Sequence, residues 1–107
     1  MMKRLCYTAM SAGGSALDIQ FPLHGDTGSP DAVSDILTRV LASASDGISR
    51  HPGVSDGDVL QALAMAMAIR ARLVDASPAA SLRLMHELVD QSFAAALNAD
   101  GYRAARA

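Results

Sequence analysis

The sequence predicts a mainly α-helical domain, with a short N-terminal β-hairpin, three helices and a tendency to form a dimer. Apolar and polar residues alternate over residues 4–23 on either side of a glycine pair, which is typical of a hairpin. Apolar residues recur at helical spacing, each time behind a capping residue, over 30–49, 56–76 and 78–98. Because 107 residues hold about one ordinary hydrophobic core, residues 1–107 are expected to form a single domain.

Composition favours association and argues against a nucleic-acid partner. Hydrophobic residues make up 50% of the chain, which is too many for a disordered protein. With two Tyr, two Phe and no Trp, the core must consist largely of aliphatic residues, Ala and Met, which bury little area or pack loosely. Oligomerisation is a common remedy in so small a chain. The net charge is −2 and the charges are mixed, whereas direct binding of nucleic acid requires clustered cations.

The hairpin is expected at residues 4–23. Its two alternating segments flank the connector Ser11–Ser15, which contains Gly13 and Gly14. The apolar positions are Leu5, Tyr7 and Ala9 in the first segment and Leu17, Ile19 and Phe21 in the second. Because an isolated hairpin is marginal in water, we expect it to lie on the helices or to pair with its copy in a second protomer.

The helix at 30–49 has one apolar face. Ser29 is a good N-cap, Pro30 suits the first helical position, and Asp31 complements the helix dipole. Its apolar stripe, about 140° wide at 100° per residue, comprises Val33, Ile36, Leu37, Val40, Leu41, Ala44 and Ile48. His51-Pro52-Gly53 stops the helix.

The helix at 56–76 carries more apolar surface than one face requires. Ser55 and Asp58 have the spacing of a capping box at its start. The main row is Leu60, Leu63, Met67, Ala71 and Val74. A second row, Ala62, Ala66, Ile69 and Leu73, is rotated from the first by roughly 130°.

The helix at 78–98 follows at once, with Ser77 as its cap, so these two helices are expected to form an antiparallel pair or a sharp corner. Its core row is Leu82, Met85, Val89, Phe93 and Ala96, and its second ridge is Leu84, Leu88 and Ala95. We expect Gly101 to cap the end of the helix, and residues 102–107 to fray or to extend it by a turn.

Surplus apolar surface of this kind usually marks a partner site. We therefore expect the second rows to form a dimer or partner interface, together with Arg70, which lies between the two rows of its helix. The expected residues are Ala62, Ala66, Ile69, Arg70, Leu73, Leu84, Leu88 and Ala95. The alternative is that these rows pack against the helix at 30–49 and the hairpin. Arg70 would then only cover apolar surface with its stem.

No motif indicates catalysis, a cofactor or a metal. His86-Glu87 starts as a zinc-protease helix does, but Asp90 replaces the second histidine. His86 and Asp90 could share a metal, yet two ligands do not make a site, and a hydrogen bond between them at the rim of the core is the simpler role. Gly13-Gly14-Ser15 is followed by no lysine, so it is not a phosphate loop. We expect a protein that is not an enzyme and has no cofactor.

The sequence also favours the cytoplasm. Cys6 is the single cysteine, which is consistent with a reducing compartment. Leu5–Ala12 is short and interrupted by Thr8 and Ser11, so no signal peptide is expected. No apolar run is long enough to span a membrane.

In size, character and order of elements, the chain resembles the QslA-like quorum-sensing anti-activators of pseudomonads. The likeness comprises the compact opening Met1–Gly14, the Ala- and Met-rich helix Asp56–Ala76 and the helix Pro78–Asn98. It implies a dimeric cytoplasmic protein that binds the ligand-binding domain of a LuxR-type regulator such as LasR. Such binding would block dimerisation of the regulator and its binding to DNA. The resemblance assigns no residue roles, because no motif anchors it.

The expected function is that of a non-enzymatic regulatory protein that binds and sequesters another protein. One alternative is a small helical DNA-binding dimer, in which the last two helices form a distorted helix-turn-helix. Both helices are long for that motif and the turn is short. A small enzyme or metal protein is the other alternative.

Overall fold

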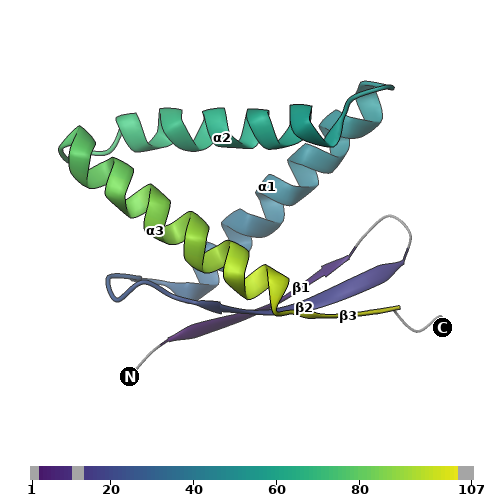
Figure 1. Ribbon diagram of the computed structural model, residues 1–107, viewed down its shortest axis with the longest axis horizontal. Coiled ribbons are helices and arrows are strands. Elements are labelled where there is room, and N and C mark those ends of the chain that lie inside the picture. Colours follow the sequence, from purple (N-terminus) through teal and green to yellow (C-terminus); the bar gives the residue numbers. More distant parts are fainter. Residues whose placement is uncertain (1–2, 11–13, 104–107) are drawn as a thin grey trace. The chain divides into compact units, whose positions relative to one another are not determined.

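The computed structural model describes residues 3–10 and 14–103, and the side chains of residues 3–10 and 14–99. It has a hairpin and three helices, which confirms the mainly α-helical class (Figure 1). The order is β1 (Arg4–Met10), β2 (Ser15–Pro22), α1 (Pro30–Arg50), α2 (Asp56–Arg72), α3 (Pro78–Leu97) and β3 (Asp100–Arg103). The chain divides into two compact units. The helical unit is Asp35–Met85, and the sheet unit comprises the residues before and after it.

In the sheet unit, the hairpin predicted at residues 4–23 is confirmed. β1 and β2 are antiparallel, with Tyr7 opposite Ile19 and Leu5 opposite Phe21, so the expected apolar positions share one face. On the other face, the Cys6 thiol donates a hydrogen bond to Gln20 Oε1 at 3.0 Å. Cross-strand pairing therefore follows the alternation of the sequence on both faces.

The prediction for the end of the chain is wrong. Gly101 does not cap a helix but lies in β3, which pairs antiparallel with β2, and the sheet order is β1-β2-β3. Residues 102 and 103 belong to this strand, and 104–107 lie outside the described residues. The second edge of β2 offers unpaired backbone groups, and β3 satisfies them. Among the side chains described, the buried hydrophobic ones are Ala16 and Ile19, both on this central strand.

Ser29 caps the start of α1, as predicted, because its Oγ accepts a hydrogen bond from the Ala32 backbone N–H at 3.1 Å. Two ion pairs at 2.9 Å, Arg39 with Asp35 and Arg50 with Asp46, mark a polar side of the helix. The spacing of these four residues places them opposite the apolar stripe. α1 is therefore a one-faced helix, as its sequence indicates.

The caps of α2 and α3 are also as predicted. Ser55 Oγ accepts from the Asp58 backbone N–H at 3.0 Å, and the Asp58 carboxylate accepts from the Ser55 N–H at 3.1 Å. Ser77 Oγ accepts from the Ala80 N–H at 3.2 Å. α2 ends at Arg72 rather than at Ala76, because the Val74 N–H bonds to the Ala71 carbonyl and so leaves the α-helical pattern.

The helices of the helical unit do not pack along one another. α2 and the first turns of α3 diverge at a sharp corner, which was one of the two predicted geometries (Figure 1). No described side chain between Asp35 and Met85 is buried. The apolar stripes of this unit are therefore at most partly covered by the unit itself.

Candidate interaction surface on α1 and α2

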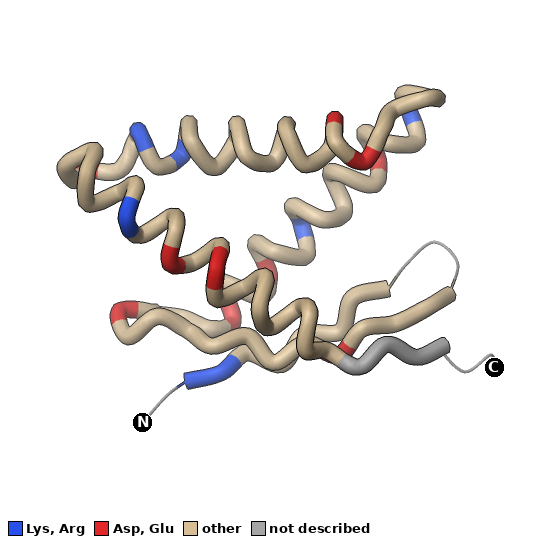
Figure 2. The backbone as a smooth tube through the Cα atoms, viewed as in Figure 1, with Lys and Arg blue, Asp and Glu red and all other residues tan. Residues whose placement is uncertain are grey.

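The middle of α2 is uncharged and exposed. No Lys, Arg, Asp or Glu lies between Asp58 and Arg70, and the charges of α2 are confined to its two ends (Figure 2). Leu60 is 67% exposed and Met65 is 55% exposed, although they point to nearly opposite sides of the helix. Ala66, on a third side, is exposed as well. Apart from Gln61, the residues between Asp58 and Arg70 are apolar on every side of the helix, a pattern typical of a buried helix, yet most of them are exposed here.

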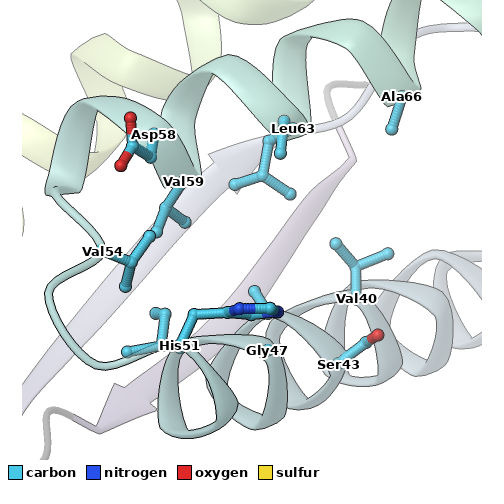
Figure 3. A pocket seen from close by; sticks show the side chains of 12 residues that line it. Val40, Ser43, Gly47, His51, Val54, Asp58, Val59, Leu63 and Ala66 are labelled. Carbon is cyan, nitrogen blue, oxygen red and sulfur yellow. The ribbon is translucent and has the colours of Figure 1, made fainter.

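α1 and α2 enclose an apolar groove beside the loop that joins them. Its cavity volume is about 400 Å³. In Figure 3, Val59 and Leu63 point from α2 toward α1, and Val40 points from α1 toward α2. The α1 wall also includes Ser43, Ala44, Gly47 and Ile48, the α2 wall includes Asp58, Ala62 and Ala66, and His51 and Val54 lie at the loop. The lining is mainly aliphatic, which suits an apolar occupant and not a charged ligand.

The structure brings only part of the predicted interface together. Ala62 and Ala66 line the groove. Ile69 is 64% exposed on α2, and Arg70 on α2 and Leu73, the residue that follows this helix, are exposed as well; none of the three lines the groove. On α3, Leu84 and Leu88 are exposed and Ala95 is half-buried. Leu84 belongs to the helical unit, whereas Leu88 and Ala95 belong to the sheet unit. The role of these residues as an interface stays a prediction.

The expected core rows of α2 and α3, which begin with Leu60 and Leu82, are not buried in the single chain. Leu60 and Phe93, both assigned to core rows, are 67% and 64% exposed, whereas Leu88, assigned to the second ridge, is 38% exposed. The groove wall of α2 combines Leu63 from the main row with Ala62 and Ala66 from the second. Helical periodicity shows which residues share a side, but it does not show which side is covered.

Sequence reasoning missed the groove because it described Val40, Ala44 and Ile48 only as part of the apolar stripe of an ordinary one-faced helix. Two features of the sequence could have predicted it: α1 has one apolar face, and α2 has apolar residues on nearly every side. A smaller cavity of about 210 Å³ lies between the end of α2 and the start of α3. It is lined by Ala68, Ala71, Arg72, Ala76, Pro78, Ser81, Leu82 and Met85. Both cavities lie within the helical unit.

The described residues form no constellation for chemistry. They contain no group of three or more His, Cys, Asp or Glu that could hold a metal ion. His86 and Asp90 are exposed on α3, where no hydrogen bond joins them. Cys6 is an exposed free thiol. In the part of the chain that the structure describes, no helix has the length and apolar character to cross a membrane.

Comparison of the chain with protein-family models, curated proteins and solved structures finds no match. These comparisons therefore add nothing to the resemblance to quorum-sensing anti-activators.

Proposed function

We propose that this protein is a non-enzymatic regulator that binds and sequesters another protein. The observation that carries the proposal is the uncharged and exposed middle of α2. Contiguous apolar surface of this kind marks sites of protein association. Occupying the interface of a target requires a matching apolar surface and no catalytic group.

The burial energy of such an interface exceeds the cost of association only when several large side chains are buried together. Burial of a fully exposed Ile or Leu side chain contributes roughly 1.5–3 kcal/mol, and Ile69 and Leu73 are 64% and 69% exposed. Association itself costs an estimated 4–15 kcal/mol, so one side of one helix gives a marginal complex. A stable complex needs the target to cover α2 or α3 along its length.

In its specific form, the proposal is an anti-activator acting in the cytoplasm on a LuxR-type quorum-sensing transcription factor. Binding to the ligand-binding domain of that regulator would block its dimerisation and so its binding to DNA. The support is the resemblance of the sequence and the aliphatic character of the exposed surface, which suits competition for an apolar dimer interface.

The test uses purified chain, a LuxR-type regulator from the same cell and the regulator's DNA site in a mobility-shift assay. We expect the chain to remove the regulator from DNA at near-stoichiometric concentration. Ile69→Asp and Leu84→Asp should weaken this effect while far-UV circular dichroism stays unchanged. Ala42→Asp is the matched control, because it adds the same charge to the polar side of α1.

Two results would contradict the proposal. If the regulator still bound its DNA site at a saturating concentration of this protein, the anti-activator role would be refuted. A shift of DNA by the chain alone, with a steep dependence on salt, would instead favour the DNA-binding dimer.

A further inference from the structure

We propose that the outer edge of β1 binds an extended segment of another protein as an additional strand of the sheet. This segment carries acidic residues at the end that lies beside Lys3 and Arg4. The edge belongs to the sheet unit, whereas the uncharged middle of α2 belongs to the helical unit. The inference therefore goes beyond the proposed function and does not rest on it.

The first argument is that β1 has unsatisfied backbone groups along one edge. The Leu23 N–H donates to the Lys3 carbonyl at 2.9 Å, and the register of β1 with β2 continues without a break from this pair. In an antiparallel ladder, every second residue exchanges both backbone bonds with its partner, so Leu5 and Tyr7 bond to β2. Within the described residues, no strand pairs with the other edge of β1. The N–H and C=O groups that point outward there are those of Arg4, Cys6, Thr8 and Met10.

The second argument is that this edge lacks the features that usually protect an edge strand. Charged residues, proline, bulges and short length all discourage the pairing of edges. β1 has seven residues, a continuous register, and neither a charge nor a proline after Arg4. β3, at the other edge of the sheet, has four residues, with Asp100 and Arg103 at its ends. The length and composition of β1 therefore suit the addition of a strand.

The side chains of β1 determine the character of the added strand. Leu5 and Tyr7 are half-buried on one face of the sheet, and Cys6 and Thr8 are exposed on the other. Side chains of neighbouring strands meet on the same face, where matched pairs stabilise the sheet. The segment should therefore alternate apolar and polar residues, with its apolar side chains beside Leu5 and Tyr7.

Charge distinguishes this partner from a second copy of the chain. Lys3 and Arg4 are exposed, and neither forms an ion pair with the described residues. Acidic residues directly opposite them on an added strand would supply that pairing. The β1 strand of a second copy contains no Asp or Glu, so it would leave both cations without an opposite charge. The edge therefore favours a segment with acidic residues at one end.

The probe is a synthetic peptide in which three threonines alternate with three valines, followed by two glutamates. Paired antiparallel with β1, it places its glutamates opposite Arg4 and Lys3 and its valines on the half-buried face. Amide hydrogen exchange, measured for each residue by NMR, reports the pairing. In the chain alone, the Thr8 amide should exchange faster than the Tyr7 amide, which bonds to β2. With the peptide at roughly ten times its Kd, exchange at Thr8 should slow about tenfold.

Modified peptides and a charge-reversed chain provide the matched controls. N-methylation of the threonines removes the N–H groups that face β1, so it should abolish the slowing. N-methylation of the valines, whose N–H groups face away from β1, should leave the slowing intact. Lys3→Glu and Arg4→Glu together should weaken binding about fivefold, and a peptide with lysines in place of its glutamates should restore it.

Three results would overturn the proposal. Equal slowing by both methylated peptides would mean that the peptide does not pair with β1 as a strand. Unchanged exchange at Thr8 in the highest soluble concentration of peptide would mean that the edge binds no such segment. A Thr8 amide that is protected in the chain alone, and that exchanges faster on dilution, would assign the edge to a second copy.

Discussion

Two glycines near the groove should respond to alanine with opposite signs. Gly47 lies within α1, and a Cβ added there would meet no atom within 4 Å. Because alanine is favoured over glycine inside a helix by roughly 0.5–1 kcal/mol, Gly47→Ala should raise the free energy of unfolding by that amount. Gly53, in the loop after α1, has a φ of +89°. Alanine in this left-handed region costs about 1–2 kcal/mol, so Gly53→Ala should lower the free energy of unfolding.

The measurement is urea unfolding followed by far-UV circular dichroism, at a low and a high protein concentration because any self-association would stabilise the folded chain. The two variants should differ by about 1.5–3 kcal/mol. An unchanged free energy of unfolding in Gly53→Ala would refute the left-handed backbone conformation of residue 53. A lower free energy of unfolding in Gly47→Ala at low protein concentration would refute the free space beside residue 47. A gain in stability that disappears only at high protein concentration would instead place a second copy of the chain close to Gly47.

The other predictions concern the caps, the ion pairs and the third strand. Ser55→Ala should lower the free energy of unfolding by about 1 kcal/mol in urea, because the Asp58 N–H loses its acceptor. A change below experimental error would contradict the cap. Asp46→Asn should cost at most about 0.5 kcal/mol, because its ion pair with Arg50 is exposed, and a larger loss would show that α1 is buried on that side. Truncation after Ala99 removes β3, so amide exchange in β2 should accelerate, and unchanged protection of β2 would argue against the third strand.

The features that the sequence predicts well are local ones. The capping box depends on Ser55 and Asp58, three positions apart, and the hairpin on two adjacent alternating segments. β3 was missed because its partner, β2, lies at the opposite end of the sequence. Gly101 is compatible with both a helix cap and a strand. It lies in a strand because the edge of β2 that does not pair with β1 pairs with residues 100–103.

The interaction surface was predicted only in part for a different reason. Periodicity arguments assume that a chain covers its own apolar stripes. In α3 that assumption fails, since Phe93, from the expected core row, is more exposed than Leu88 from the expected partner ridge. In α2 the surplus of apolar residues was visible in the sequence. Which side lines the groove depends on the angle of the loop at His51–Val54, which local propensity does not determine.

Self-association and target binding place different demands on the two helices. A second copy bound on α2 would cover the uncharged middle of that helix and leave Leu84 and Leu88 on α3 available to a target. Ile69→Asp should therefore weaken both the dimer and the complex with the target, because a charge on α2 is buried in the first and alters the surface presented to the second. Leu84→Asp should weaken only the complex with the target. Equal losses of both activities in both variants would mean that one continuous surface serves both partners and that the target must displace the second copy.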